Sequence, residues 1–240
     1  GWRLKKICGQ KKICLELGGN AGLIIDKDSD IEDAISKTII GGFAYAGQVC
    51  IHTQRIYVHQ NIYDDFVPKF VGKVKEIRIG HPLDENVFLN PMITLEEAIR
   101  AEKWVNEAIQ DGAKILCGGN REGNNIDATV LINTTPEMKV EAKEVFAPVV
   151  TIKKFDDFKD AIEMVNDTVY GLQAGVFSNN MKNILYAFEN LEVGGVIIND
   201  TPTFRVDQMP YGGIKNSGFG REGVKYTMQE MTEIKLMVIG

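Results

Sequence analysis

The chain has 240 residues, of which 44% are hydrophobic and 25% are charged, and this balance excludes the disordered, collagen-like and coiled-coil classes. Acidic residues outnumber basic ones by 33 to 27, so the formal net charge is −6 and no basic excess exists to attract nucleic acid or an anionic membrane. No apolar run approaches the roughly 20 residues that a membrane-spanning helix needs. We therefore expect a globular domain with neither nucleic acid nor membrane as a partner.

The predicted elements alternate between strands and helices. Strands are expected where short apolar runs end at turn residues, over 13–17, 23–25, 55–59, 115–117, 149–153, 174–177, 196–199 and 233–239. Helices are expected where apolar residues recur at helical spacing, over 29–45, 62–77, 95–110, 158–166 and 181–191. Ser29 and Glu32 predict a capping box at the first of them. This alternation predicts an α/β fold with an open, largely parallel sheet flanked by helices, whose strand ends carry the site.

The cysteine pattern bears on the cellular setting. Four cysteines lie at positions 8, 14, 50 and 117, without a Cys-x-x-Cys pair, and the three histidines are scattered. This density does not suit a disulfide framework, and no group has the spacing of a structural zinc site. We expect a cytoplasmic protein in a reducing setting, with no metal site and with its cysteines either buried or nucleophilic.

Cys50 is the first candidate for chemistry, because it follows a predicted helix and Gly47. Glycine lets the backbone turn sharply and lets a substrate approach closely. A cysteine on such a turn can offer its sulfur for attack on a carbonyl and its own backbone N–H to the resulting oxyanion. The competing interpretation is a buried cysteine that packs as a small hydrophobic residue.

Glu16 is the second candidate, because it is the only charged residue in its apolar segment and two glycines follow it closely. A carboxylate flanked by leucines at a strand end is partly desolvated, which raises its pKa toward the value that suits a general base. The competing interpretation is a glutamate that simply points to solvent from an edge strand.

Four segments together resemble the aldehyde dehydrogenase superfamily. They are Leu15–Gly19, Gly47–Cys50, Lys143–Pro148 and, after Asn199, the glycine-rich stretch Pro210–Glu222, which is similar to the family's Pro-Phe-Gly-Gly-x-Lys-x-Ser-Gly segment. The segments occur in the family's order across nearly the whole chain. Gly218, Gly220 and Gly223 also fit a dinucleotide fingerprint, but no predicted strand precedes them, and we interpret them as a turn.

The resemblance implies a role for each matching residue. Cys50 attacks the aldehyde carbon, hydride passes to NAD or NADP, and water deprotonated by Glu16 hydrolyses the resulting thioester. Glu144 matches the residue that holds the nicotinamide ribose, Phe146 matches the aromatic residue beside the nicotinamide, and Leu17 is implied as a further cofactor contact. Ala147 stands where the family commonly has glycine, and its methyl would crowd the turn if its φ were positive.

The resemblance also implies a division of the chain. Family enzymes are longer, so we expect this chain to be the C-terminal, catalytic half. Residues 1–17 would be a remnant of the cofactor-binding domain, 18–220 the catalytic domain, and 221–240 a C-terminal segment with an oligomerisation strand. Because an unpaired apolar strand is prone to association, we expect a homodimer or homotetramer.

The substrate follows less directly from the residues. The resemblance implies a pocket lined by Val49, Ile51, His52, Phe204 and Arg205. Arg205 could bind a carboxylate or phosphate on the aldehyde, or could be a solvated surface residue. We expect a small aldehyde that is polar, hydroxylated or anionic.

Two other functions remain open. The chain could be a catalytically incomplete fragment or an oligomerisation module, with at most a thiol-esterase activity. It could also be a coenzyme-A-acylating aldehyde dehydrogenase, but those members commonly lack the glutamate that Glu16 matches. We therefore favour the hydrolytic, NAD(P)-dependent reaction.

Overall fold

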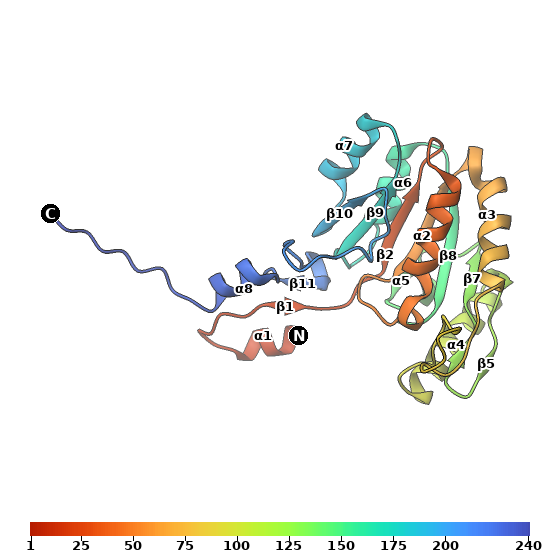
Figure 1. Cartoon of the computed structure of the whole chain (residues 1–240), viewed down its shortest axis with the longest axis horizontal. Helices are drawn as coiled ribbons and strands as arrows, with labels where there is room; N and C mark the ends of the chain where they lie inside the picture. Colours follow the sequence, from red (N-terminus) through yellow and green to blue (C-terminus); the bar gives the residue numbers. More distant parts are fainter.

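The computed structural model describes residues 1–240, and a seven-stranded sheet forms its centre (Figure 1). The strand order is β10-β9-β2-β3-β8-β7-β4, and every neighbouring pair is parallel except β7 and β4. Its strands are β2 (Ala21–Ile25), β3 (Thr53–His59), β4 (Lys114–Cys117), β7 (Thr129–Ile132), β8 (Val149–Phe155), β9 (Gln173–Phe177) and β10 (Gly195–Ile198). The predicted fold class, an open and largely parallel sheet flanked by helices, is confirmed.

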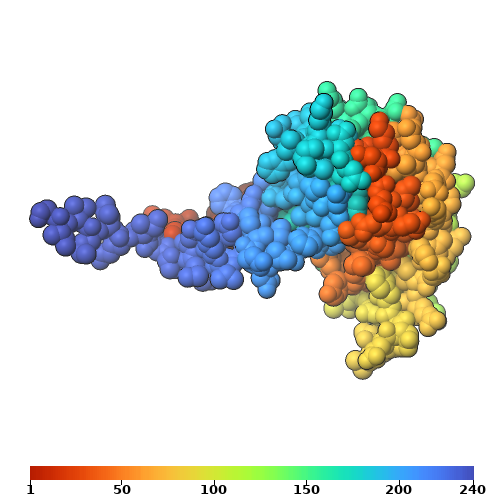
Figure 2. Space-filling model, turned by 45° about the horizontal axis from the view of Figure 1, so that its top comes forward, coloured from red at the N-terminus to blue at the C-terminus, as the bar shows by residue number.

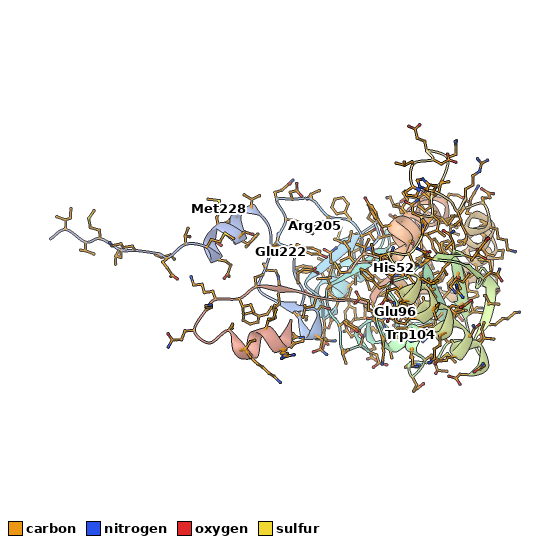
Figure 3. All side chains as sticks on the ribbon, turned by 90° about the horizontal axis from the view of Figure 1, so that it is seen from below. His52, Glu96, Trp104, Arg205, Glu222 and Met228 are labelled. Carbon is orange, nitrogen blue, oxygen red and sulfur yellow. The ribbon has the colours of Figure 1, made fainter.

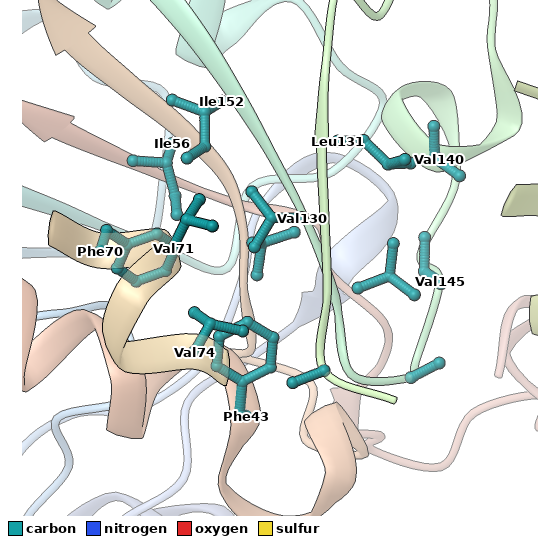
Figure 4. Packing of buried hydrophobic residues seen from close by; sticks show 14 of the residues in the cluster. Phe43, Ile56, Phe70, Val71, Val74, Val130, Leu131, Val140, Val145 and Ile152 are labelled. Atoms are coloured by element: carbon teal, nitrogen blue, oxygen red, sulfur yellow. The ribbon is translucent and has the colours of Figure 1, made fainter. Parts of the chain in front are cut away.

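Helices cover both faces of this sheet because its central strands are apolar on both sides. Within β2, Leu23 and Ile25 face one core and Ile24 faces the other, as strand alternation requires. The first core contains α2 (Ile31–Phe43), α3 (Gln60–Lys75), α4 (Leu95–Gln110) and α5 (Lys139–Ala142). The second contains α6 (Phe158–Asn166) and α7 (Met181–Asn190). Figure 4 shows the first core, where the aromatic rings of Phe43 and Phe70 pack against valines of several elements.

Segments from near the two ends of the chain pair beside this body. The short strand β1 (Leu15–Glu16) pairs antiparallel with β11 (Gly218–Phe219), outside the main sheet. The helices α1 (Trp2–Ile7) and α8 (Val224–Glu230) lie next to this pair, and the last residues extend away from the body (Figures 1 and 2). The remaining elements are a hairpin of β5 (Arg121–Glu122) and β6 (Asn125–Ile126) and the 3₁₀ turns η1 (Ala44–Gly47) and η2 (Lys215–Ser217).

The structure differs from the predicted elements at several ends. The N-cap of α2 is Asp30, whose carboxylate accepts the N–H groups of Glu32 and Asp33, whereas the Ser29 hydroxyl bonds to the carbonyl of Phe177. The predicted capping box is therefore wrong, because a charged acceptor outcompetes a hydroxyl at the positive end of a helix. The helix also ends at Phe43 and does not reach residue 45.

Two strand predictions also change. The segment 233–239 is not a strand, since no neighbouring strand offers it hydrogen bonds, and its side chains are exposed, including Ile234. The predicted strand 13–17 contracts to two residues, and β7 was not predicted. None of the helices combines the length and the apolar character needed to cross a membrane.

Candidate active site

The candidate site lies at the sheet edge where β2, β3, β8 and β9 begin. Gly19 lies just before β2, Cys50 just before β3, Phe146 just before β8, and Leu172 directly before β9. These strands are parallel and adjacent in the sheet, so their first residues share one edge. Segments far apart in the sequence therefore meet at the amino-terminal ends of the strands.

A sharp turn places Cys50 at this edge. After α2 ends, Tyr45, Ala46 and Gly47 take the left-handed conformation, with φ of 54°, 55° and 65°. This conformation costs roughly 1–2 kcal/mol for a residue with a side chain, so the surrounding structure must hold the turn. Gln48 does so, because its Oε1 accepts the Ile93 N–H at 2.9 Å. The backbone N–H of Cys50 makes no hydrogen bond within the chain.

Gly47 fixes this turn against a second predicted segment. A Cβ built on Gly47 would lie 2.2 Å from the carbonyl oxygen of Ala147, so no side chain fits there. The positive φ of the second segment, 49°, belongs to Phe146 and not to Ala147. The φ of Ala147 is not positive, so its buried methyl does not crowd the turn in the way that the sequence analysis considered.

The residues around Cys50 form a support beneath the turn. Ile51 is buried in a small cluster with Leu172 and Tyr211, and Val49 packs against that cluster half-buried. His52 is also buried, and its Nε2 lies 2.8 Å from the carbonyl oxygen of Gly42. The structure thus places His52 inside the fold, where it supports the turn, and not on an exposed pocket wall as expected from the sequence.

The Cys50 thiol faces a tyrosine hydroxyl. Its Sγ lies 3.0 Å from Oη of Tyr211, whose side chain is almost fully buried. Burial raises the pKa of the Cys50 thiol to about 11, and the hydrogen bond with Tyr211 opposes this rise. The thiol is therefore protonated at rest, and a base or a stabilising donor is needed to form the thiolate.

Glu16 faces both of these groups. Its strand β1 is aligned by pairing with Gly218, and the next residue, Leu17, donates its N–H to the carbonyl of Ser217 at 2.9 Å. Burial raises the pKa of the Glu16 carboxyl, and the neighbouring Cys50 and Tyr211 side chains lower it to a smaller extent. The Oε1 atom is buried without a hydrogen-bond partner. A desolvated carboxylate with a free oxygen suits a general base.

Gly18 and Gly19 place the Glu144 carboxylate close to Glu16 and Cys50. The N–H of Gly19 donates to Oε1 of Glu144 at 2.9 Å, and a Cβ built on Gly18 would lie 2.2 Å from Oε2 of Glu144. A Cβ on Gly19 would lie 2.5 Å from the carbonyl oxygen of Cys50. Burial raises the pKa of Glu144, and the Gly19 N–H opposes this rise. The glycine pair thus brings Glu16, Cys50 and Glu144 to one place.

The other residues implied as cofactor contacts flank this group. Phe146 follows Glu144 closely and is half-buried. Leu17 is also half-buried, and its side chain packs against the chain at Gly1, where a Cβ would lie 2.5 Å from a Leu17 methyl. A nicotinamide cofactor carries ribose hydroxyls from which a carboxylate can accept hydrogen bonds, and the half-buried Gly18 beside Glu144 has no side chain to block a close approach. These residues fit the group that the resemblance implies.

Arg205 and Phe204 lie on the loop before the glycine-rich segment. The Arg205 guanidinium lies 4.1 Å from the centre of the Tyr211 ring, and its Nη2 lies 3.3 Å from Oε2 of Glu222. Both members of this ion pair line a surface groove of about 860 Å³. Figure 3 shows them close together near the C-terminal segment, with His52 inside the main body. The Phe204 side chain is exposed.

Sequence reasoning missed Tyr211 as a functional residue. A signal was present, because tyrosine stands in this chain where the similar segment of the superfamily has phenylalanine, and the added atom is the hydroxyl that meets Cys50. Asn199, which belongs to the same family pattern, has a structural role: its Oδ1 accepts the Ser178 N–H at 3.0 Å. The structure holds no group of three or more residues able to ligate a metal ion.

Comparison with known proteins identifies the class. The aldehyde dehydrogenase family model matches residues 1–237, and the chain therefore belongs to this family. It is 47% identical over 239 residues to a 3-sulfolactaldehyde dehydrogenase of Priestia aryabhattai, covering all of this chain and 50% of that protein. The chain thus spans about half the length of the curated relatives that it matches.

Two solved structures have the same fold. Aldehyde dehydrogenase 21 of Physcomitrella patens, in complex with the reaction product succinate, matches with a TM-score of 0.98 and 47% identity, over 100% of this chain and 50% of that one. A glyceraldehyde-3-phosphate dehydrogenase of Methanocaldococcus jannaschii, complexed with NADP, matches with a TM-score of 0.95 and 44% identity, over 98% and 51%.

Proposed function

We propose that this chain supplies the catalytic half of an NAD(P)-dependent aldehyde dehydrogenase that oxidises a small aldehyde to a carboxylic acid. The observation that carries the proposal is the convergence of the Cys50 thiol, the Tyr211 hydroxyl and the unpartnered Glu16 oxygen at one sheet edge, beside Glu144. In the same proposal, residues 1–17 belong to the cofactor-binding domain, 18–220 form the catalytic domain and 221–240 carry an oligomerisation segment.

Cys50 begins the reaction as a nucleophile. Its thiol loses a proton, the sulfur bonds to the aldehyde carbon, and the carbonyl oxygen becomes an oxyanion beside the free Cys50 N–H. The product is a thiohemiacetal, which is oxidised to a thioester on the same sulfur. The chemistry that bound NAD(P)+ supplies is acceptance of the hydride.

Glu16 completes the reaction as a general base. Its buried oxygen takes a proton from water, whose oxygen then attacks the thioester carbon. The carbon–sulfur bond breaks, the carboxylic acid leaves, and the cysteine sulfur is restored. A coenzyme-A-acylating enzyme would not need this base, so the desolvated Glu16 favours hydrolysis.

Glu144 and the glycine pair would hold the cofactor. The Glu144 carboxylate keeps Oε2 available after Oε1 accepts the Gly19 N–H, and it can accept a ribose hydroxyl. Phe146 and Leu17 would flank the same group. The choice between NAD and NADP stays open in this proposal.

The aldehyde is proposed to be small and to carry a hydroxyl or an anionic group. The relatives named above act on 3-sulfolactaldehyde and carry succinate as a product, and both molecules are small anions. The Arg205 guanidinium lies 4.1 Å from the centre of the Tyr211 ring and could exchange Glu222 for a substrate anion.

The test is oxidation of an aldehyde panel, with NAD+ and with NADP+, by this chain completed with the half of the Priestia aryabhattai 3-sulfolactaldehyde dehydrogenase that it does not match, because the chain spans only half of that protein. The panel contains 3-sulfolactaldehyde, lactaldehyde, glyceraldehyde 3-phosphate and an uncharged aldehyde of similar size. We expect turnover that Cys50→Ser abolishes, and a KM for the anionic members that Arg205→Met raises selectively. Turnover that survives Cys50→Ser would refute the proposal.

A second function rests on the C-terminal segment. The side chains of Leu236, Met237 and Ile239 are all more than 80% exposed, which is unusual for apolar residues in a row. An apolar extended segment can pair with a sheet edge of another copy. The chain would then also act as an oligomerisation module, and sedimentation of chain 1–230 beside chain 1–240 tests this directly.

A further inference from the structure

Tyr211 is held rigidly against the candidate nucleophile. Its N–H donates to the carbonyl of Glu222 at 3.0 Å, and the Glu222 N–H donates back to the Tyr211 carbonyl at 2.6 Å. Its ring packs in the buried cluster with Ile51 and Leu172. The phenol can therefore present its hydroxyl to only one region, and Sγ of Cys50 lies there at 3.0 Å.

We propose that Tyr211 is a positioning residue for Cys50, and that its hydroxyl donates the hydrogen bond that fixes the sulfur beside Glu16 and stabilises the thiolate. This inference rests on the proposed function, in which Cys50 is the nucleophile. The role belongs to the hydroxyl alone, since a phenylalanine ring would fill the same space.

The direction of the hydrogen bond follows from the charge states. A neutral thiol can donate to or accept from a phenol, but a thiolate can only accept. Burial raises the pKa of Tyr211 above its usual range, so the phenol keeps its proton at neutral pH. When Cys50 ionises, the O–H of Tyr211 must therefore point at sulfur, and the bond becomes charge-assisted and stronger.

The surroundings leave few other groups for this task. Glu16 is also close to Cys50, but its negative charge disfavours a thiolate. The Arg205 guanidinium lies 4.1 Å from the centre of the Tyr211 ring, and its positive charge lowers the pKa of the phenol slightly, which makes the hydroxyl a better donor. The tyrosine hydroxyl is thus the donor that offsets the burial of the sulfur.

The test compares Tyr211→Phe with the unaltered chain by measuring how fast Cys50 reacts with neutral dipyridyl disulfide between pH 7 and 9. Peptide mapping separates Cys50 from the other cysteines, Cys8, Cys14 and Cys117, which serve as internal references. Tyr57→Phe is the matched control, because Tyr57 is equally buried and its hydroxyl also bonds, to the carbonyl of Met164 at 3.1 Å.

The expected result follows from the strength of a charge-assisted hydrogen bond. Its loss raises the thiol pKa by about one unit. A one-unit rise lowers the thiolate fraction tenfold, while the more basic thiolate is about threefold more nucleophilic, so Cys50 in Tyr211→Phe reacts about three- to fourfold more slowly. Tyr57→Phe leaves the Cys50 rate unchanged, and thermal unfolding confirms that both variants are folded.

The outcomes separate this inference from the proposed function. Equal Cys50 rates in Tyr211→Phe and the unaltered chain, with aldehyde oxidation retained, would overturn the role of Tyr211 alone. A slower Cys50 rate in Tyr211→Phe, together with no aldehyde oxidation by the completed protein of the aldehyde test, would support the hydrogen bond and contradict the proposed function. A rate that falls equally in Tyr57→Phe would also overturn the inference, because general loosening would then explain it.

Discussion

Gly47 and Ala147 are in backbone contact: a Cβ placed on the glycine would lie 2.2 Å from the carbonyl oxygen of the alanine. This contact joins the turn that carries Cys50 to the segment that carries Glu144 and Phe146. The geometry of the proposed site therefore requires glycine at position 47, because any side chain there would separate the two segments.

Gly47→Ala should destabilise the chain strongly. The substitution adds a steric clash with backbone and forces a left-handed φ of 65° on alanine, so we expect the free energy of unfolding to fall by at least about 2 kcal/mol. The matched control is Gly72→Ala in α3, where an added Cβ meets nothing within 4 Å. That change should stabilise by about 0.5–1 kcal/mol in urea denaturation. Similar losses in both variants would contradict the packing described here.

His52 should make stability depend on pH. Burial lowers its pKa from 6.5 to about 4, so the unfolded chain binds more protons than the folded chain between these values. This contribution is fully present above pH 6.5 and is lost as the pH falls toward 4, by about 3 kcal/mol in total. The measurement is the difference in unfolding free energy between the unaltered chain and His52→Gln across this range.

The exposed His81 supplies the control for that measurement. His81→Gln should keep the pH dependence of the unaltered chain, whereas His52→Gln should flatten it. Taking the difference between chains removes carboxyl groups that titrate in the same range. Parallel curves for all three chains would show that His52 does not carry the effect.

Glu144 and Gly18 should act together on cofactor binding. Glu144→Gln removes a charged acceptor, and Gly18→Ala places a methyl where Oε2 of Glu144 lies. We expect either change to weaken binding of NADP+ or NAD+ about tenfold, since a hydrogen bond to a charged group contributes roughly 1.5 kcal/mol or more. Titration calorimetry on the completed protein of the aldehyde test measures this affinity, with Gly72→Ala as the neutral reference. Unchanged affinity in both variants would remove Glu144 from the cofactor site.

The sequence predicted the sheet and its flanking helices well because their signals are local. Apolar runs such as Leu23–Ile25 and the periodicity of 95–110 depend only on near neighbours. The strand predicted at 233–239 failed because a strand also needs a partner, which no local pattern reveals. β7 carries the same kind of local signal, an apolar and β-branched run followed by Asn133, and it was overlooked in the sequence.

For the site, too, the local features could be predicted from the sequence and the long-range contacts could not. Cys50, Glu16 and Glu144 could be singled out by residue type, nearby glycines and family resemblance, and the structure brings them together. The direction of a side chain within a turn could not be predicted, which is why His52 was expected in a pocket and lies buried. The contact of Tyr211 with Cys50 joins residues 161 positions apart, and only the fold reveals it.

Deacylation should be lost as the pH falls through the pKa of Glu16. A general base works only when deprotonated, and burial raises this pKa from its usual value of 4.5. The rate of thioester hydrolysis should therefore decline on the acidic side at a higher pH than an exposed glutamate would give. A pH profile of single-turnover hydrolysis measures this, and Glu16→Gln should lack that limb altogether.

The most direct test of the account is acylation of the 240-residue chain by p-nitrophenyl acetate, which needs no cofactor, followed by peptide mass mapping. We predict one acetyl group, on Cys50, that turns over in the unaltered chain and accumulates in Glu16→Gln, where deacylation slows about a hundredfold or more. Glu144→Gln should deacylate like the unaltered chain, since its carboxylate is assigned to the cofactor. Acetylation of another residue, or equal deacylation in Glu16→Gln and the unaltered chain, would contradict the account.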